Sequence, residues 1–425
     1  MSPVAATVEG YLQARIKNHY AGVVGEYRKR KIAFWHRYGP GGHAECGGHA
    51  IPRLIEILAK NCEIHYFGMR SQSPTPPLIA AHAQLHLLPF CFNRSSMGGK
   101  LLKTFIWYLA LPLMALRCRL MGVTVIYLDE TLPLSAAIVR FFFGKNVAIT
   151  VADFFMTVYF GRRPWGRILS RVVERLDFAS WRRLPLIFTK VQYTRSYLAQ
   201  LGIRPERVVP VYNPCDTTVY FPRDRAESRR RLGINSDDLV LVHHGILHPN
   251  KGNTRIIKAL ADLKPRLPQL RYLLVGAGPE EKALRRLVAD LELAESVIFT
   301  GWLPTEADVN WALNAADIGL VMRIGQFSDS FHLTDTLVHE MACGLPILAA
   351  RLAGIEEVID EGVNGFLFDP NDMDEFKSKL LMLAGNQELR QKLGQAALET
   401  CRREFDLDSI AQKMAAPLLR LAGAA

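Results

Sequence analysis

The stretch HLTDTLVHEMACGLPILAARLAGIEEV, residues 332–358, contains a helix, a break and a strand in close succession. The pattern predicts a helix that starts near Thr334 and stops at Gly344-Leu345-Pro346, since glycine and proline end helices. Residues 346–350 then form a short apolar run that is typical of a buried strand. Among the apolar positions of the helix stands a carboxylate, Glu340, whose presence there needs a reason.

The same alternation of strand and helix runs along the whole chain. Strands are expected in both halves, at residues 31–39, 62–69, 123–130, 146–155 and 185–190, and at residues 238–247, 271–278, 296–303, 316–323 and 345–351. Alternating strands and helices form parallel sheets with right-handed crossovers. The sequence therefore predicts an α/β protein with two doubly wound, Rossmann-like domains.

Turn-forming Asn, Pro and Asp residues near Tyr212 mark a linker between the two domains. We expect an N-terminal domain at residues 1–211, a C-terminal domain at residues 212–404, and a final helix at residues 405–425 that packs back across the cleft. A chain of 425 residues suits two large α/β domains. Ligands of parallel sheets bind beyond the carboxyl ends of the strands, so the active site is expected in the cleft.

Charge is distributed unevenly along the chain. Residues 1–210 hold 28 Lys+Arg against 11 Asp+Glu, and residues 211–425 hold 24 against 30, within a net charge of +11. A basic half suits nucleic acid, an anionic membrane or a phosphorylated substrate, and charge alone does not choose among them. Nucleic acid is the weakest of the three, because the arginines belong to no recognised reader motif.

Two stretches raise the question of a membrane. Residues 104–116 form an uncharged run, shorter than the about 20 apolar residues that span a bilayer. This run is either a buried helix of the first domain or a helix lying in the membrane interface. Residues 161–185 place Trp165 and Trp181 among arginines, and form either a solvated helix face or a second interfacial helix.

The cysteines bear on the cellular compartment. Seven widely spaced cysteines without a Cys-x-x-Cys pair predict free thiols in a reducing compartment and argue against a zinc site. No signal peptide is expected at the N-terminus, because Glu9 and Arg15 interrupt the apolar residues there. The sequence therefore predicts a cytoplasmic location.

Several groups in the back half suit a phosphorylated sugar. Glu340, on a helix at the carboxyl edge of a sheet, is placed to accept hydrogen bonds from ribose hydroxyls, although an exposed helical Glu is common. The helix start at Thr334, Asp335 and Thr336 offers hydroxyls and backbone N–H groups to an anion, and Thr334 can equally be an ordinary N-cap. Lys251, which follows an earlier strand, can reach a diphosphate.

Glycines stand beside these groups. Gly245 follows one strand, and Gly276 and Gly278 follow the next, where they let the backbone approach a ligand closely. The third glycine of the dinucleotide fingerprint is absent, which disfavours a nicotinamide cofactor, and no other cofactor is expected. Residues 372–374 have the form Asp-x-Asp but stand at an expected helix start, so no metal site is predicted.

The order of these motifs resembles the nucleotide-sugar half of the GT-B glycosyltransferases, in the large retaining family called group one. Between residues 240 and 400 the resemblance rests on Gly245 and Lys251-Gly252, followed by VGAGPEEKAL, VIFTGWLP, HEMACGLPILAARLAGIEEVIDEGVNGFLFDPND and LRQKLGQAALE. The front half is similar only in outline, at YGPGGHAECGGHA, ITVADFF and VYNPCDTTVYFP. The resemblance implies a GT-B fold, in which two Rossmann-like domains face each other across a cleft.

The resemblance also implies roles for particular residues. Glu340 is similar to the second Glu of the family's Glu, seven residues, Glu motif, which holds the ribose, and Lys251 to its diphosphate-binding lysine. The segment from Phe299 to Gly301 is similar to the one that meets the base. Gly41 and Gly42 are similar to the loop that closes over phosphate and sugar.

Three positions depart from the family pattern. His332 stands where the first Glu is expected, Ile246 where an Arg accompanies the lysine, and Ala152 where a His precedes Asp153. His332 can hydrogen-bond a sugar hydroxyl, and Asp335 is the nearest carboxylate that can replace the missing one.

The implied function is transfer of a hexose from a UDP- or GDP-sugar to a lipid-linked or polysaccharide acceptor, with retention of configuration and without a metal. Such an enzyme would work at the inner face of a membrane, with an anionic surface as a partner. Lys251 and the helix end at Thr334 would stabilise the leaving diphosphate, and His332, Asp153 and His43 are further catalytic candidates. Two alternatives are a nucleotide-sugar epimerase of the same architecture, and a degenerate relative that binds a nucleotide sugar without transferring it.

Overall fold

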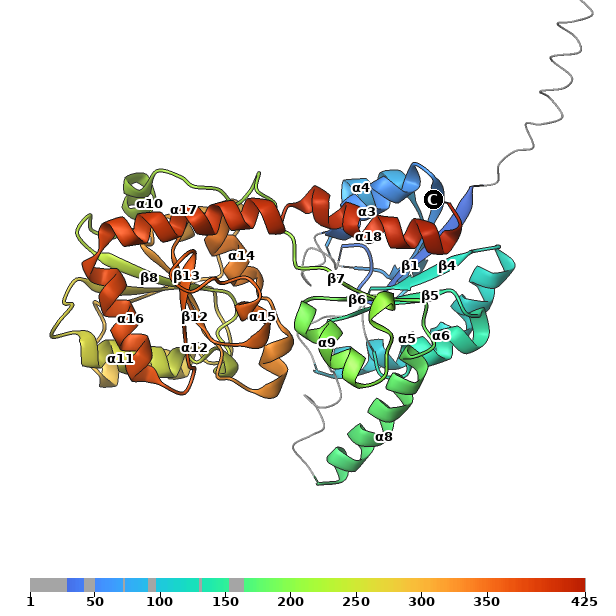
Figure 1. Ribbon diagram of the computed structural model, residues 1–425, viewed down its shortest axis with the longest axis horizontal. Coiled ribbons are helices and arrows are strands. Elements are labelled where there is room, and N and C mark those ends of the chain that lie inside the picture. The colour runs from blue at the N-terminus through green and yellow to red at the C-terminus, as the bar shows by residue number, and fades with distance from the viewer. Residues whose placement is uncertain are drawn as a thin grey trace, which may run out of the picture.

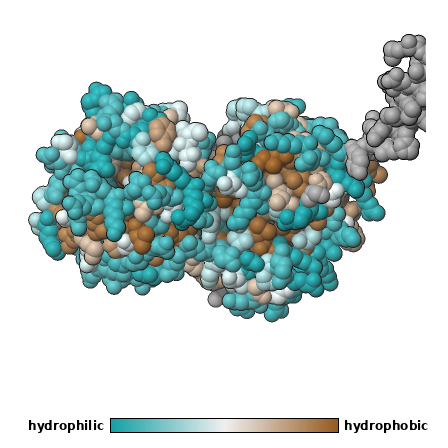
Figure 2. All heavy atoms as spheres, turned by 45° about the horizontal axis from the view of Figure 1, so that its top comes forward, coloured by the Kyte–Doolittle hydropathy of each residue, from teal (hydrophilic) through white to brown (hydrophobic). Residues whose placement is uncertain are grey.

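The computed structural model describes residues 29–41, 50–71, 73–90, 97–129, 132–152 and 164–424. The chain forms two lobes, each built on a parallel sheet with helices on both faces (Figure 1). Figure 2 shows them as two bodies joined at a narrower waist. The α/β fold with two doubly wound domains is therefore confirmed.

The N-terminal lobe contains a seven-stranded sheet in the order β3-β2-β1-β4-β5-β6-β7, with parallel neighbours throughout its described strands. The strands are β1 (Arg30–His36), β2 (Cys62–Met69), β3 (Ala83–Leu88), β4 (Val125–Leu128), β5 (Val147–Val151), β6 (Leu186–Thr189) and β7 (Val208–Pro210). The helices are α3 (Ala50–Ala59), α4 (Pro77–His82), α5 (Met97–Leu120), α6 (Ser135–Phe143), α8 (Pro164–Trp181), α9 (Gln192–Gln200) and η1 (Pro205–Arg207).

The C-terminal lobe contains a six-stranded parallel sheet in the order β10-β9-β8-β11-β12-β13. The strands are β8 (Leu239–His244), β9 (Leu270–Val275), β10 (Val297–Gly301), β11 (Ile318–Val321), β12 (Ile347–Ala350) and β13 (Gly365–Phe368). The helices are α10 (Arg225–Leu232), η2 (Pro249–Lys251), α11 (Asn253–Leu263), α12 (Glu281–Asp290), α13 (Glu306–Asn314), η3 (Phe327–Phe331), α14 (Asp335–Ala342), α15 (Ala353–Glu356), α16 (Met373–Gly385), α17 (Gln387–Glu404) and α18 (Leu407–Ala422).

Three strands lie outside the segments expected from the sequence, namely β3, β7 and β13, and each stands at the edge of its sheet. An edge strand needs no continuous apolar run, because only one of its sides is paired and its faces are partly open. β3, for example, is nowhere fully buried. β7 lies just before Tyr212, where the sequence marked the linker, so the N-terminal sheet extends to Pro210. A proline is tolerated there because β7 is an edge strand.

The last helix belongs to the N-terminal lobe. α18 packs against α3 and inserts Ile410, Met414 and Leu418 into the core on that face of the first sheet. Arg53 of α3 donates from Nε to Asp408 Oδ1 at 2.7 Å. The chain therefore crosses between the lobes twice, and the two crossings touch each other, because Cys215 N donates to Phe405 O at 2.8 Å.

The carboxyl edges of the two sheets carry the loops through which the lobes meet. Glu357, just after α15, accepts hydrogen bonds from the backbone N–H groups of Gln192, at 2.7 Å, and Tyr193 at the start of α9. Tyr193 and Tyr197 of α9 also pack their rings against Phe331 of η3. These contacts bring the ends of β6, β11 and β12 together, as expected for a site between the lobes.

Helix α5 is longer than the uncharged run that predicted it. It extends over 24 residues, and its segment Leu101–Leu120 is long and apolar enough to cross a bilayer by length and composition alone. Only 39% of the tested window is buried within the protein. One side of α5 is therefore buried, as the first reading of the sequence predicts, and the other side is exposed; the interfacial reading stays a prediction.

Candidate functional site

Lys251 lies at the carboxyl edge of the C-terminal sheet, in the loop after β8. The next residue, Gly252, has a φ of +67° and no room for a side chain, because a Cβ there would lie 2.9 Å from the side chain of Met322. Ile324 N donates to Asn250 O at 3.0 Å and fastens the loop after β11 to the same turn. The two loops therefore hold Lys251 in a fixed position.

The ammonium group of Lys251 is nearly enclosed, yet it has no hydrogen bond or ion pair with any described residue. The residue is 9% exposed. Burial, together with the nearby charge of Arg323, lowers the pKa of Lys251 to about 7. A buried amine without a partner is stabilised when an anion binds beside it, and this makes Lys251 a candidate anion-binding residue.

Arg323, two residues after β11, supplies a second cation that the sequence analysis missed. Its Nη1 donates to Asp329 Oδ1 at 2.8 Å, and the two side chains are 11% and 2% exposed. Asp329 also accepts from Gln326 N at 3.0 Å and thereby shapes η3. The resemblance gave no hint of this residue, because the expected arginine position is taken by Ile246, which is 47% exposed.

The three residues at the start of α14 have different partners. Thr334 is the N-cap residue, but its side chain caps no N–H, and its hydroxyl oxygen is buried without a partner among the described residues. Asp335 accepts from Asn213 Nδ2 at 2.8 Å, and Thr336 donates to His244 O at 2.8 Å. Asp335 and Thr336 thus hold the linker and the β8 loop, which leaves Thr334 and the positive helix end for an anion.

Glu340 lies within electrostatic range of Lys251, but it is enclosed rather than open at the sheet edge as the sequence analysis expected. The residue has no exposed surface, and it packs against β11, where a Cβ on Gly319 would meet Glu340 Oε2 at 2.6 Å. Neither carboxylate oxygen has a partner among the described residues, and burial raises the pKa of Glu340 well above its usual value. The reason is helix periodicity, because Glu340 shares the sheet-facing side of α14 with Leu337 and Met341.

Three aromatic side chains missed by the sequence analysis lie beside the start of α14. The rings of His339 and Tyr220 are stacked with centroids 3.7 Å apart, and the His244 ring lies 5.3 Å from His339. Burial lowers the pKa of His244 to about 4, so this imidazole is neutral at pH 7. The only sequence signal was the pair His243-His244 at the end of a strand.

The glycines of the two loops serve a packing purpose that the sequence analysis did not predict. A Cβ on Gly276 would lie 2.1 Å from Gly245 O, and one on Gly278 would lie 2.3 Å from Leu247 O. The loop after β9 therefore presses its backbone directly against the loop after β8. Gly276 and Gly278 thus permit the close packing of these two loops, and the approach of their backbone to a ligand stays a prediction.

The remaining predicted residues are more scattered. Phe299 and Gly301 lie on the edge strand β10, where the guanidinium of Arg285 stands 4.3 Å above the Phe299 ring. His332 follows η3, half-buried, and lies close to Thr334 in the chain. A Cβ on Gly41 would meet Ser73 O at 2.3 Å, so this glycine packs against its own lobe. The predicted residues Gly42, His43 and Asp153 lie outside the described part of the chain.

The N-terminal lobe has a small cavity at the carboxyl ends of its own strands. This cavity of about 20 Å³ lies at the ends of β4, β5 and β6, and the linker residues Tyr212 and Pro214 close it. Tyr127, in its wall, donates to Asp129 Oδ1 at 2.9 Å. Asp129 and Lys190 are the charged groups lining this cavity, and neither was predicted.

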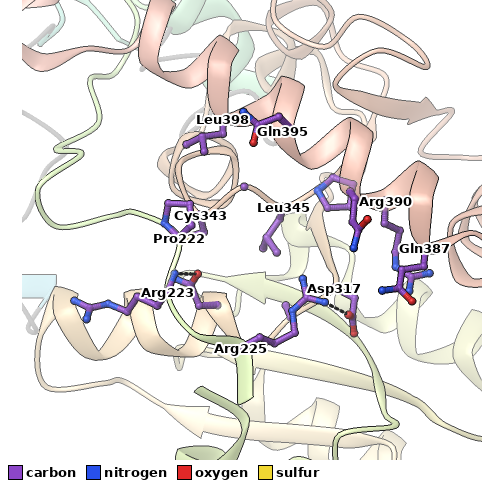
Figure 3. A pocket seen from close by; sticks show the side chains of 15 residues that line it. Pro222, Arg223, Arg225, Asp317, Cys343, Leu345, Gln387, Arg390, Gln395 and Leu398 are labelled. Carbon is purple, nitrogen blue, oxygen red and sulfur yellow. Dashed lines mark hydrogen bonds and ion pairs between the residues drawn. The ribbon is translucent and has the colours of Figure 1, made fainter. Parts of the chain in front are cut away.

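A larger cavity, of about 320 Å³, lies at the opposite edge of the C-terminal sheet, beside Asp317 and Pro346, which precede β11 and β12 (Figure 3). Two of its guanidinium groups are engaged within the protein, because Arg225 pairs with Asp317 at 2.9 Å and Arg390 donates to Leu383 O at 2.6 Å, while that of Arg223 stacks on the rings of Phe221 and Trp311. No residue predicted for the site lines it. Among the described residues, no group of three or more His, Cys, Asp or Glu could hold a metal ion.

Comparison with known proteins identifies the C-terminal lobe. Residues 224–400 match the family described as Glycosyl transferases group 1. The N-acetyl-alpha-D-glucosaminyl L-malate synthase of Bacillus anthracis is 29% identical over 209 residues, which are 49% of this chain and 52% of that protein. The GDP-mannose-dependent alpha-(1-6)-phosphatidylinositol monomannoside mannosyltransferase of Mycolicibacterium smegmatis is 33% identical over 187 residues, 43% of this chain and 48% of that protein. The chain thus spans about half the length of the curated relatives it matches.

The comparison with solved structures extends to both lobes. The structure of Anabaena HepE in complex with UDP superposes with a TM-score of 0.70 at 20% sequence identity, covering 92% of this chain and 100% of the other. At this identity the likeness concerns the fold. The chain therefore has the GT-B fold of two Rossmann-like domains, and its residues 224–400 match the model of the group 1 glycosyltransferases.

Proposed function

We propose that the protein is a glycosyltransferase that moves a hexose from a nucleotide-sugar donor to a lipid-linked or polysaccharide acceptor, with retention of configuration. The observation that carries this proposal is the nearly buried, unpartnered ammonium of Lys251, 9% exposed, at the edge where the two lobes meet. A group of this kind is costly to the fold unless a ligand anion accompanies it. The diphosphate of a nucleotide sugar supplies that anion.

In the proposed reaction, the bond between the anomeric carbon and the diphosphate oxygen breaks, and the acceptor hydroxyl oxygen bonds to the anomeric carbon on the same face. The hydroxyl proton passes to the leaving phosphate, so no protein nucleophile is needed. Negative charge grows on the diphosphate as the bond breaks. Lys251, Arg323 and the start of α14 converge on this position and stabilise the growing charge.

These protein groups supply positive charge without a metal ion, and we propose a metal-independent reaction for that reason. Arg323 takes the place of the arginine that Ile246 replaces. His332, close to the same helix start, remains the prediction for contact with a sugar hydroxyl. Asp153 and His43 remain predictions for the acceptor side.

The relatives guide the choice of donor. One is named as an N-acetyl-alpha-D-glucosaminyl L-malate synthase and another as a GDP-mannose-dependent mannosyltransferase, and the solved structure of HepE holds UDP. We therefore propose a UDP- or GDP-linked hexose. We place the reaction in the cytoplasm, at the inner face of a membrane, in line with the cysteine spacing and the basic N-terminal half.

Thermal unfolding with UDP, GDP, UDP-glucose, UDP-N-acetylglucosamine and GDP-mannose tests the proposal. Ligand at about 100 times its Kd adds about 2.7 kcal/mol to stability, which raises the Tm by at least about 5 °C for a lobe of this size. We expect one base to give this shift and Lys251→Ala to abolish it, while the exposed control Lys258→Ala keeps it. No shift with any of the five compounds would contradict the donor site.

A second measurement separates transfer from binding. Release of nucleotide from the stabilising donor is followed with and without lipid and glycan extracts as acceptor. We expect acceptor-dependent release together with a glycosylated product. A Tm shift without transfer to any extract would instead assign the protein to the non-catalytic binders.

A further inference from the structure

Helix α5 carries two apolar stripes on opposite sides. One stripe faces the core and includes Trp107, Leu111 and Cys118, each at most 2% exposed. The other faces outward, where Leu101, Phe105, Leu109, Leu113, Leu116 and Leu120 are 46–81% exposed. At about 100° per residue these outward side chains fall within an arc of roughly 120°. A helix that is apolar all round requires an apolar neighbour on every side, and here one side has none within the described residues.

The outward stripe continues onto two neighbouring helices. Phe141, at the end of α6, is 82% exposed, and Ile168, Val172 and Leu176 of α8, one helical turn apart, are 50–66% exposed. α5 contacts α6, and α6 contacts α8, on the same side of the N-terminal sheet (Figure 1). In Figure 1, α8 also extends away from the body of the lobe. We call this surface the α5–α8 face.

Exposed basic side chains border the α5–α8 face. Arg119 and Lys145 stand near the ends of α5 and α6, and Arg171 and Arg175 alternate with the apolar residues of α8. None of the four forms an ion pair with any described residue. Between residues 97 and 183 the sequence holds 13 Lys+Arg against 5 Asp+Glu, a net charge of +8. The surface therefore combines apolar side chains with unpaired positive charge.

We propose that the α5–α8 face docks onto an anionic lipid bilayer, with its apolar side chains in the interface and its basic residues at the headgroups. A second copy of the chain fits this face less well, because symmetric pairing would bring two strongly positive surfaces together. Scattered surface leucines need no partner, but a contiguous apolar surface of this extent does.

The geometry favours docking over spanning. Although α5 is long enough to cross a bilayer, its inner stripe belongs to the core, where Trp107 packs against Trp35 with ring centroids 6.4 Å apart. Thr104 accepts a hydrogen bond from Arg37 at 2.7 Å across the same junction. A spanning α5 would have to leave these contacts, whereas a docked α5 keeps them.

Docking also serves the proposed function, on which this part of the inference rests. α9, the next helix on the same side of the sheet, packs against η3 at the carboxyl edge of the C-terminal sheet. A bilayer at the α5–α8 face thus lies next to the opening between the lobes. A membrane-embedded acceptor could present its hydroxyl there without leaving the bilayer.

Flotation of the full chain with phosphatidylglycerol–phosphatidylcholine vesicles, against pure phosphatidylcholine, tests the inference in two variants. Arg171→Glu with Arg175→Glu should lower binding at least ~30-fold, because each basic residue near an anionic surface contributes about fivefold. Leu109→Gln with Leu113→Gln should lower binding at least ~10-fold and leave the residual binding more salt-sensitive. Lys392→Glu with Lys413→Glu, exposed residues elsewhere, removes the same charge and should change binding less than about twofold.

Thermal unfolding first checks that each variant is folded. Each outcome of the binding measurements then supports or overturns the inference. No binding of the native chain to anionic vesicles at low salt would overturn it, and so would equal losses in the Lys392/Lys413 control. Resistance to alkaline carbonate extraction would show a spanning helix instead. A dimer that Leu109→Gln with Leu113→Gln dissociates would show that a second copy covers the face. None of these measurements uses a donor, so their failure is separate from that of the proposed function.

Discussion

The two lobes share one architecture, but they differ in which kind of side chain is unfavourably placed. At the carboxyl edge of the C-terminal sheet, charged groups are buried with too few partners, as Lys251 and Arg323 show. On the helical layer of the N-terminal lobe, apolar side chains are exposed without a cover, as along α5. Departures from good packing mark functional surfaces. In our two proposals the first departure accommodates a polyanion and the second a lipid surface, so the contrast proposes one ligand for each lobe.

The largest effect is expected from removing the amine of Lys251 at the carboxyl edge of the C-terminal sheet. We expect Lys251→Ala to lower turnover of the stabilising donor by about a hundredfold or more, the loss typical of a group that stabilises charge in the transition state. Steady-state release of nucleotide measures this. Lys258→Ala on α11 is the matched control and should keep full turnover. If Lys251→Ala turned over normally, the amine would have no place in the mechanism.

The second cation can be removed without removing the first. Arg323→Met should weaken UDP binding by about 10- to 100-fold, because a charge-assisted hydrogen bond contributes about 1.5–3 kcal/mol. It should also lower stability by about 3–5 kcal/mol, since Asp329 is left buried and unpaired. Calorimetry of UDP binding and thermal unfolding measure the two effects.

A double variant separates these two effects. Arg323→Met with Asp329→Asn removes the uncompensated carboxylate and should recover most of the stability while UDP binding stays weak. Recovery of both would mean that Arg323 acts only by holding η3 in place.

The pH dependence of nucleotide binding sharpens the assignment of the anion site. The pKa of Lys251 is lowered to about 7 in the free protein, and the diphosphate needs the protonated amine. Affinity for UDP should therefore be highest near pH 6–7, where the amine is protonated and the terminal phosphate is ionised, and fall by up to about tenfold per pH unit above pH 7. The same shift makes folding stability rise with pH between about 7 and the unfolded-state pKa of about 10.4. Binding that is flat from pH 6 to pH 9 would contradict a titrating Lys251.

The smallest effect on binding is expected at Glu340. Its pKa is raised by burial, so the folded protein holds a proton that the unfolded chain loses, and stability declines as pH rises above the unfolded-state pKa of about 4.3. Glu340→Gln should remove this decline and raise stability at pH 8 by about 1 kcal/mol or more, with UDP binding unchanged. Thermal unfolding across pH and calorimetry check both. A large loss of UDP affinity, absent in the exposed control Glu295→Gln, would show that this carboxylate reaches the ligand.

Much of the C-terminal lobe could be predicted from the sequence because its strands are buried on both faces and read as continuous apolar runs. The edge strands β3, β7 and β13 could not, because their signal comes from pairing, which involves residues far away in the chain. Lys251 was found through local spacing, since a strand, a turn and a helix start follow each other directly.

The rest of the site depends on tertiary structure. Arg323 sits in an irregular loop with no periodicity, and only the folded loop brings it to Lys251. For Glu340, the sequence identified an unusual carboxylate but placed it at the sheet edge. The side of α14 that Glu340 occupies was readable from the apolar residues Leu337 and Met341, and helix periodicity outweighs the resemblance there. For α5, the sequence analysis considered only the length of the uncharged run. It did not show that the apolar residues form two stripes on opposite sides of the helix.

The return of α18 to the first lobe bears on how the protein is made. Ile410, Met414, Leu418 and other buried residues of α18 complete a core whose remaining buried members lie before residue 212. During synthesis, the first lobe must wait until the entire second lobe has left the ribosome before its own interior is closed. The lobe that is translated first is therefore finished last, and any chain that stops short of α18 leaves the ribosome with that interior open to water.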